Sequence, residues 1–234
     1  MKPIADIIPV DSARPDAAVI ARAAETIHTG GVVVFPTLGL YGLGADPFNP
    51  KAVQRVFEIK NRAAGKALLV LIADMSGLDR VARPPNVMAR DLMRRFWPGR
   101  VTFVLTARKD LPVALTGNSG NIGVRLVAHP VAAALVRAVA APLTGTSANI
   151  SGAGGCPTVQ QIDIELLSGV DLILDAGPLA GGPGSTVVDV TGEAPLILRE
   201  GAIGADEILA FFKSKGRGDQ GANNGRKINR NKRS

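Results

Sequence analysis

Residues 31–44 read GVVVFPTLGLYGLG, a run of apolar residues followed by a glycine-rich turn. The run Gly31–Phe35 predicts a buried strand that ends at Pro36. Because the turn Pro36–Gly44 follows a strand, we expect its polar groups at the carboxyl edge of a sheet, where α/β proteins bind ligands. Its three glycines allow the backbone to approach a ligand closely. A tight turn that merely packs Tyr41 explains the pattern equally well.

On both sides of this strand, helical and strand patterns alternate irregularly along the chain. We expect helices at residues 15–29, 50–59, 86–96, 130–139 and 205–213, and one more opened by the capping-box pattern Thr158-x-x-Gln161. We expect further strands at residues 68–72, 101–106, 121–126, 172–175, 186–190 and 196–198. Since several strands follow one another late in the chain, the pattern favours a mixed α/β sheet over a wholly parallel one.

The chain has 234 residues, of which 46% are hydrophobic and 20% charged. This composition excludes a disordered chain, a collagen-like repeat and a disulfide scaffold, and the length suits one α/β domain. The net charge, 27 − 20 = +7, is unevenly distributed. Residues 215–234 hold seven basic residues and one acid (7 − 1 = +6), which leaves +1 for residues 1–214. We therefore expect a domain over residues 1–214 and a basic, disordered tail over residues 215–234.

The sequence also indicates a compartment. The single cysteine, Cys156, cannot form an internal disulfide, and the first residues lack the apolar core of a signal peptide. The longest apolar run, Ala67–Ala73, is far shorter than the ~20 residues of a membrane helix. We therefore expect a cytoplasmic protein without a membrane partner.

A cluster of cations follows the helix expected at residues 50–59. Lys60, Arg62 and Lys66 lie within seven residues of one another and could hold phosphates, since arginine offers a planar fork and lysine a compact charge. Cations near the end of a helix are also favourable without any ligand. By itself, this cluster is better explained as a solvated surface.

Two polar loops have compositions that suit anions. The loop Thr144–Gly152 combines five hydroxyl or amide side chains with two glycines, a density that indicates a site rather than a plain turn. The glycine-rich segment Gly181–Thr186 suits a carboxylate or phosphate beside Ser185, or else forms a flexible hairpin. Arg125 and Arg199 lie at the ends of predicted strands, where isolated arginines are usually surface residues.

Several kinds of site lack their characteristic residues. The chain has no G-x-x-x-x-G-K-[ST] segment, no H-E-x-x-H and no C-x-x-C, so we expect neither a P-loop nor a protein-bound metal. His28 and His129 are expected to be structural, and Cys156 has no candidate base to activate it. Aromatic residues make up only 4% of the chain, which disfavours a stacking surface for single-stranded RNA.

Taken together and in this order, these segments resemble one family, the YrdC-type threonylcarbamoyl-AMP synthases. The resemblance runs from about residue 12 to about residue 205. It rests on PTLGLYGLGADPFN (36–49), IKNRAAGKAL (59–68), WPGRVTFVL (97–105), GVR (123–125), TSANISG (146–152), STVVD (185–189) and LREGAI (198–203). The K-x-R pair followed by the S-x-N pair is the most specific part of the pattern.

This resemblance implies a YrdC-like α/β fold, an open, twisted sheet of mixed parallel and antiparallel strands flanked by helices, whose concave face binds ATP. Members of the family condense L-threonine, bicarbonate and ATP, with Mg²⁺, to L-threonylcarbamoyladenylate and pyrophosphate. Other proteins then transfer the threonylcarbamoyl group to adenosine 37 of tRNA. This chain resembles the short, single-domain form of the family.

The resemblance also implies roles for individual residues, and it assigns none to a metal. The catalytic positions are Lys60 and Arg62. The ATP-binding positions are Arg62, Lys66, Asn121, Asn149, Thr158 and Arg199. The threonine-binding positions are Thr37, Arg125, Ser147 and Ser185.

The chain departs from the family pattern on the acceptor side of the expected pocket. The family's turn is often P-T-[ED]-T-V-Y-G-L, but Leu38 here replaces the acid and Gly39 the second threonine. Leu71 stands where many members have a histidine near threonine. A related carbamoyl-transfer reaction with another acceptor is therefore one alternative. Another is a non-enzymatic module of the same fold that binds duplex RNA, tRNA or the ribosome through a basic face and tail.

Overall fold

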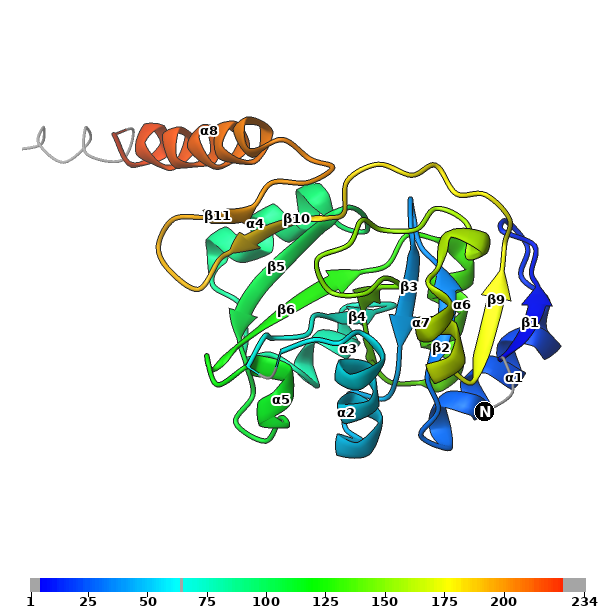
Figure 1. Ribbon diagram of the computed structural model, residues 1–234. Helices are drawn as coiled ribbons and strands as arrows, with labels where there is room; N and C mark the ends of the chain where they lie inside the picture. The colour runs from blue at the N-terminus through cyan, green and yellow to red at the C-terminus, as the bar shows by residue number, and fades with distance from the viewer. Residues whose placement is uncertain (1–4, 64, 225–234) are drawn as a thin grey trace, which may run out of the picture.

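The strands form two hydrogen-bonded sheets, with helices packed outside them (Figure 1). The computed structural model describes residues 5–63 and 65–224. The five-stranded sheet has the order β1 (Asp6–Pro9), β9 (Leu172–Asp175), β2 (Val33–Pro36), β3 (Tyr41–Gly44), β8 (Thr146–Ser147). The six-stranded sheet has the order β11 (Leu196–Arg199), β10 (Thr186–Asp189), β5 (Val101–Thr106), β6 (Asn121–Leu126), β4 (Val70–Ile72), β7 (Leu143–Thr144). Both sheets mix parallel and antiparallel pairs, which confirms the predicted fold class, although we had not predicted their division into two.

The two sheets are joined where β7 and β8 follow one another with only Gly145 between them. Thr144 N donates to Ala45 O (2.9 Å), and Ala45 N donates to the Thr144 hydroxyl (2.9 Å). Gly145 N donates to Leu69 O (2.8 Å). A Cβ at Gly145 would lie 2.5 Å from Leu71 Cγ, so this crossing requires glycine. The polar loop after β8 therefore starts at the junction of the sheets.

Five of the described helices begin at a residue whose side chain accepts hydrogen bonds from the first free N–H groups of the helix. The described residues contain α1 (Ala17–His28), α2 (Pro50–Ile59), α3 (Ser76–Asp79), α4 (Val87–Phe96), α5 (Val113–Thr116), α6 (Pro130–Val139), η1 (Val159–Gln161), α7 (Ile164–Gly169) and α8 (Ala205–Asn224). The side chains of Asp16, Asn49 and Asn86 accept hydrogen bonds from the first turns of α1, α2 and α4.

No helix in this described part of the chain is long and apolar enough to cross a membrane.

Two hydrophobic cores lie on opposite sides of β2, because successive side chains of a strand point to opposite faces. Val34 belongs to the core that α2, α4 and α7 cover. Val33 and Phe35 belong to the other core, together with Ile27 of α1 and Leu135 of α6. The turn that follows β2 is thus held by packing on both sides of its strand.

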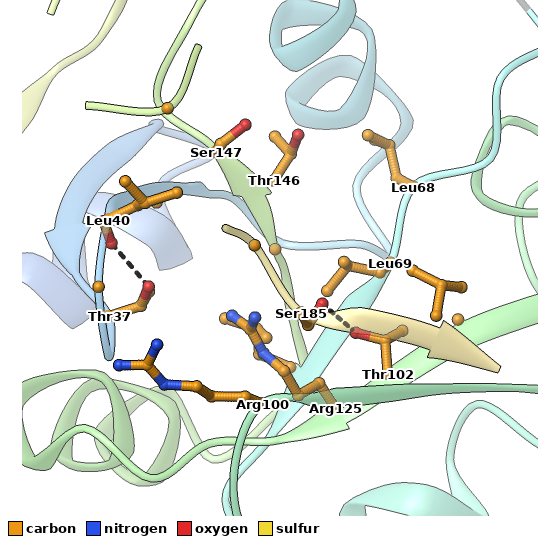
Figure 2. Close-up of a pocket in the computed structure, with 18 of the residues that line it drawn as sticks. Thr37, Leu40, Leu68, Leu69, Arg100, Thr102, Arg125, Thr146, Ser147 and Ser185 are labelled. Carbon is orange, nitrogen blue, oxygen red and sulfur yellow. Dashed lines mark hydrogen bonds between the residues drawn. The ribbon is translucent and has the colours of Figure 1, made fainter. Parts of the chain in front are cut away.

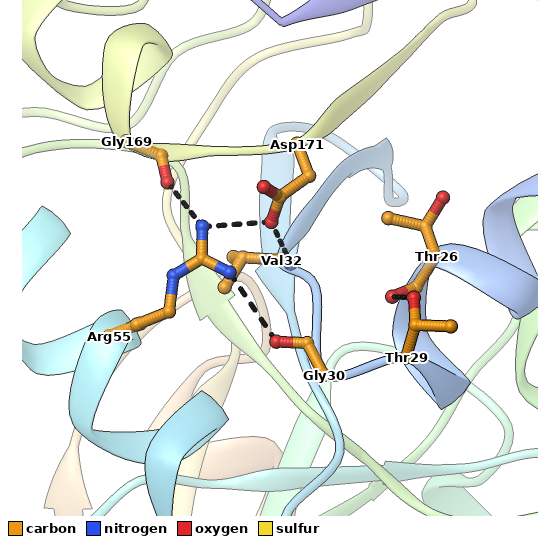
Figure 3. Close-up of polar contacts among 7 residues, drawn as sticks. All are labelled: Thr26, Thr29, Gly30, Val32, Arg55, Gly169 and Asp171. Atoms are coloured by element: carbon orange, nitrogen blue, oxygen red, sulfur yellow. Dashed lines mark hydrogen bonds and ion pairs between the residues drawn. The ribbon is translucent and has the colours of Figure 1, made fainter. Parts of the chain in front are cut away.

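Arg55 connects α2 to the beginning of β2 and the segment before β9 (Figure 3). Its Nη2 pairs with Asp171 Oδ2 (2.8 Å) and donates to Gly169 O (3.0 Å), and its Nη1 donates to Gly30 O (3.4 Å). Asp171 Oδ2 also accepts from Val32 N (2.7 Å). This network fixes α2, and so the cation cluster that follows it, relative to the five-stranded sheet.

The predicted capping box at Thr158 is wrong. The Thr158 side chain makes no capping hydrogen bond and is followed only by the 3₁₀ turn η1. The helix begins instead at Ile164, where the Asp163 side chain accepts from Glu165 N (2.7 Å). Burial of the leucines in α7 selects this start, since tertiary packing supplies most of the stability of a short helix.

The last helix extends beyond its predicted end. α8 continues to Asn224, whereas we expected the helix to end at Lys213 and a disordered tail to begin at residue 215. Ile208 is buried, and Phe211 packs edge-on against Phe96 with ring centroids 5.8 Å apart. These contacts anchor the first turns, after which each further residue adds a backbone hydrogen bond. Residues 225–234 of the predicted tail lie outside the described residues.

Candidate active site

A cavity of about 640 Å³ lies where the two sheets meet (Figure 2). Its lining includes residues of β4, β5, β6 and β10 in the six-stranded sheet. The lining also includes the turn after β2, the cations after α2, the polar loop Thr144–Gly152 and the glycine-rich segment before β10. Further lining residues lie directly before β5, in β11 and around the start of α6. The fold therefore brings together the four segments that the sequence had singled out separately.

The cavity is strongly cationic. Among the lining residues that the structure describes there is no aspartate or glutamate. The positively charged ones are Lys60, Arg62, Lys66, Arg100, Arg125 and Arg199. Like charges held together without a counter-charge repel one another, so this arrangement favours a ligand that carries several negative charges.

Lys60 holds the polar loop in place. The side chain is almost fully buried, with 2% of the residue exposed. Its Nζ donates to Asn149 O (2.6 Å) and to Ser147 O, which leaves one of its three protons for a ligand. Burial, together with the nearby charge of Arg62, lowers the pKa of Lys60 to about 8.

The side chains of the loop also hold one another. Ser147 Oγ donates to Asn149 Oδ1. Asn149 Nδ2 donates in turn to Ala153 O (2.6 Å) and Ile150 O (2.9 Å). These bonds fix the conformation of the loop before any ligand binds, so its polar groups are preorganised around the cavity.

Arg62 and Lys66 add two charges to the wall of the cavity. Arg62 is half-buried and donates from Nη2 to Ala67 O (2.7 Å), whereas Lys66 is exposed. Burial lowers the pKa of Arg62, but a guanidinium stays charged at neutral pH. Both charges are therefore available to the phosphates of a ligand.

Arg125 occupies the face of β6 that lines the cavity (Figure 2). It is half-buried, and no hydrogen bond or ion pair to its side chain is found within the described part of the chain. Burial and repulsion from Arg199 and Arg100 lower its pKa to about 10. Nearby, Ser185 Oγ and Thr102 Oγ1 share a buried hydrogen bond of 2.8 Å. A guanidinium in such surroundings can hold a carboxylate through two parallel hydrogen bonds.

Thr37 and Tyr41 organise the turn after β2 in different ways. Thr37 lines the cavity, and its hydroxyl donates to Leu40 O (2.6 Å). The Tyr41 hydroxyl lies deep in the protein, where it contacts Asp175 Oδ1 (3.0 Å) and Gly177 O (2.8 Å), and burial raises its pKa. Tyr41 therefore anchors the turn, while the hydroxyl oxygen of Thr37 can still accept a hydrogen bond from a ligand.

The departures at Gly39 and Leu71 have steric reasons. Gly39 O accepts from Gly181 N (2.9 Å), and a Cβ at Gly39 would lie 2.4 Å from Gly181 O. This contact between two glycine-rich segments excludes a side chain at position 39. Leu71 is fully buried and fills the space beside Gly145. The cavity thus has no side chain at 39 and an apolar one at 71.

Most of the residues predicted to form the site come together. Those that line the cavity are Thr37, Lys60, Arg62, Lys66, Arg125, Ser147, Asn149, Ser185 and Arg199. Two residues predicted to contact ATP, Asn121 and Thr158, do not line the cavity. Asn121 is the first residue of β6 and lies beyond the part of the strand that lines the cavity, and Thr158 precedes η1.

Arg100 and Ser151 are among the polar residues of the lining that had no predicted role. Arg100 stands directly before β5 and lines the cavity (Figure 2). Its Nη2 donates to Leu38 O (3.0 Å). A cation before a strand was the only signal, and it does not indicate which face the side chain takes. Ser151 closes a motif already singled out. Its Oγ is buried and has no hydrogen-bond partner among the described residues.

Comparisons relate this chain to one group of known proteins. The family model Sua5/YciO/YrdC, with the description "Telomere recombination", matches residues 25–201. A threonylcarbamoyl-AMP synthase of Bacillus subtilis (strain 168) is 36% identical over 194 residues, which are 82% of this chain and 56% of that protein. The chain thus spans little more than half the length of this curated relative.

Two solved structures are similar as well. The crystal structure of P. abyssi Sua5 complexed with L-threonine has a TM-score of 0.83 and 35% sequence identity, and the match covers 88% of this chain and 60% of that one. The crystal structure of E. coli YciO has a TM-score of 0.79 and 29% identity, and the match covers 88% of this chain and 99% of that one.

Proposed function

This chain belongs to the Sua5/YciO/YrdC family, and we propose that it acts as a threonylcarbamoyl-AMP synthase. The observation that supports this most is the cavity of about 640 Å³, whose lining has six cations and, among the described residues, no acid. Such a lining suits ATP together with an acceptor that carries a carboxylate. The proposed reaction converts L-threonine, bicarbonate and ATP to threonylcarbamoyl-AMP and pyrophosphate.

In this proposal the acceptor binds at Arg125. The guanidinium has no partner in the described part of the chain and would hold the threonine carboxylate by two hydrogen bonds. Ser147 and Ser185 supply hydroxyl groups beside it, and Thr37 supplies a hydroxyl oxygen from the turn after β2. The threonine amine would thereby be directed toward bicarbonate and the nucleotide.

The nucleotide would bind at the cations after α2 and at the polar loop. Lys60, Arg62 and Lys66 face its phosphates, with Asn149 and Arg199 as further contacts. Lys60 has one proton left for a phosphate oxygen because its other two bind the loop. We propose Lys60 and Arg62 as the catalytic residues. Hydrogen bonds to backbone oxygens hold both positive charges in place next to the expected phosphates.

The chemistry needs electrostatic stabilisation rather than a protein nucleophile. The threonine ammonium gives up a proton and reacts with bicarbonate, forming the carbamate N–C bond and releasing water. A carbamate oxygen then bonds to the α-phosphorus, and the bond from that phosphorus to the bridging oxygen breaks. Pyrophosphate leaves with the electron pair, so negative charge develops on oxygens that Lys60 and Arg62 can stabilise.

Magnesium would enter with the nucleotide. The described lining offers hydroxyl and carbonyl oxygens but no carboxylate, so it does not form a protein-held Mg²⁺ site. The ligands of the ion would be the phosphates of ATP and water. Mg²⁺ is therefore part of the substrate in this proposal.

The proposal extends to partners and location. The product would be passed to proteins that transfer the threonylcarbamoyl group to adenosine 37 of tRNA. The basic C-terminal segment, residues 215–234, could help to bind tRNA or other duplex RNA through phosphates. A cytoplasmic location fits these substrates and the single cysteine.

Pyrophosphate release tests the proposal. Purified protein is assayed with ATP, Mg²⁺ and bicarbonate, with and without L-threonine. We expect release to depend on threonine. We expect Arg62→Gln and Arg125→Gln each to lower kcat/KM by about 100-fold, because each removes a charge that acts on the reacting groups. The matched control is Arg94→Gln, which changes an exposed arginine of α4.

Two other results would favour the alternatives. Release that does not depend on threonine, with ATP still bound, would indicate another acceptor. Failure to bind ATP, with duplex RNA still bound by a protein truncated before residue 215, would indicate an RNA-binding module.

A further inference from the structure

The mechanism above leaves one guanidinium of the cavity unused. We propose that Arg100 and Arg125 together form a subsite for a second anionic group on the acceptor, in addition to its α-carboxylate. This inference rests on the proposed function and concerns the chemical class of its acceptor. It makes Arg100 a specificity-determining residue of the site.

The backbone and one edge of the Arg100 side chain are fixed. Arg100 O accepts from Thr186 N (3.0 Å), which ties the residue to β10. Its Nη2 donates to Leu38 O (3.0 Å) in the turn after β2. Its Nη1 lies 3.8 Å from the position that a Cβ on Gly39 would take. The Arg100 guanidinium is therefore held in the cavity wall (Figure 2), beside Gly39, a turn position that has no room for a side chain.

Arg100 and Arg125 are close enough to repel one another. The charge of Arg100 contributes to the lowered pKa of Arg125. Both side chains are half-buried, and no described acid in the lining neutralises either of them. Arg199, whose charge also acts on Arg125, has its Nη2 bound to Ser185 O (2.7 Å). Paired positive charges without a counter-charge are unfavourable, so the pair is best satisfied by a ligand with two negative groups.

The rest of the acceptor side offers little to a neutral polar group. Position 39 has no side chain, and Leu71 is apolar and fully buried. One α-carboxylate occupies one guanidinium fork, which leaves the second fork for another carboxylate-type anion. Such an anion has two sources. It is either the carbamate that bicarbonate forms on the acceptor amine, or a side-chain carboxylate, as in aspartate or glutamate.

Kinetics of Arg100→Gln separate these sources. Pyrophosphate release is measured with ATP while bicarbonate, L-threonine, L-aspartate and L-glutamate are varied. If the anion is the carbamate, the variant raises the KM for bicarbonate by about 10-fold or more, while the KM for ATP stays unchanged. If it is a side-chain carboxylate, the wild type prefers aspartate or glutamate to threonine, and the variant loses that preference; this result would support the subsite but replace threonine as the acceptor of the proposed function. Arg100→Lys is expected to recover part of either effect, and Arg94→Gln is the control.

Direct binding tests the subsite without turnover. Calorimetry compares malonate, which has two carboxylates, with acetate, which has one. We expect the wild type to bind malonate at least about 10-fold more tightly than acetate, and Arg100→Gln to lose this difference. Equal binding of the two anions by the wild type would overturn the proposal. So would an Arg100→Gln variant whose stability or kcat changes while its KM for bicarbonate and its preference among the amino acids stay the same. A wild type that binds malonate preferentially but releases no pyrophosphate would instead contradict only the proposed function.

Discussion

Ser151 and Ser185 both line the cavity, but their hydroxyl groups have different surroundings. Ser185 Oγ shares a 2.8 Å hydrogen bond with Thr102, whereas Ser151 Oγ is buried without a partner in the described part of the chain. Removing a bonded hydroxyl leaves its partner unsatisfied, while removing an unpartnered one does not. We expect Ser185→Ala to lower the free energy of unfolding by about 1–3 kcal/mol and Ser151→Ala to leave it unchanged or raise it. Urea denaturation of both variants checks this, and equal losses would contradict it.

Because burial lowers the pKa of Lys60, we expect its contribution to the stability of the fold to depend on pH. Its pKa of about 8 in the folded protein lies below the ordinary value of 10.5, because burial disfavours the ammonium form. Between these two values the unfolded chain binds more protons than the folded one, so the contribution of Lys60 to stability rises with pH. Below about pH 8 both states are charged and the unfavourable contribution is complete.

Lys60→Met removes this titration and provides the reference. The free energy of unfolding is measured in urea for both proteins at about pH 7.5 and about pH 9.5. The difference, wild type minus variant, is expected to increase with pH. A difference that is constant or decreases would show that the folded-state pKa of Lys60 is not lowered.

At the scale of elements, the contact between Gly39 and Gly181 joins the turn after β2 to the segment before β10. A Cβ at Gly39 would lie 2.4 Å from Gly181 O, so Gly39→Ala must push the two segments apart. We expect a loss of about 1–3 kcal/mol in the free energy of unfolding, with lower activity because both segments line the cavity. Gly154→Ala is the matched control, since a Cβ there meets nothing within 4 Å. Equal effects of the two substitutions would show that this contact is unimportant.

The ion pair between Arg55 and Asp171 acts on several elements at once. Asp171 also accepts from Val32 N (2.7 Å), so Asp171→Ala leaves a backbone N–H and a guanidinium without this acceptor. We expect the free energy of unfolding to fall by about 1–3 kcal/mol. Asp6→Ala, which breaks an exposed pair with Arg22, should change it by less than about 1 kcal/mol. Thermal or urea unfolding of both variants tests this expectation. Similar losses in the free energy of unfolding would mean that Asp171 does not fix α2.

At the scale of the whole molecule, charge is gathered in one place. Residues 1–214 have a net charge of only 20 − 19 = +1, yet six cations line a single cavity. We therefore expect pyrophosphate to stabilise the fold, by about 2.7 kcal/mol at a concentration 100 times its Kd. Arg62→Gln should weaken this stabilisation. The measurement is the unfolding temperature with pyrophosphate, compared with chloride at the same ionic strength. Equal shifts in unfolding temperature with the two salts would show that the effect is only screening of charge.

Local patterns were sufficient for much of the secondary structure. The predicted bounds of the helices at 50–59 and 130–139 and of the strands at 101–106 and 121–126 agree with the structure. Proline in the first turn and apolar residues at regular spacing determine such elements locally. The predictions at Thr158 and Lys213 were wrong because burial of α7 and the contact of α8 with Phe96 depend on distant parts of the chain.

The sequence by itself determined the mixed α/β class, the family resemblance and nine of the polar and charged residues that line the cavity, because these follow from residue types and their order along the chain. Only the tertiary structure decided that Arg100 shares a cavity with Arg125, that Asn121 lies outside its lining, and that Gly39 must contact Gly181. These relations depend on which strand faces are brought together and at which register. That choice is made by long-range packing of the two sheets around Gly145, which no local pattern of residues encodes.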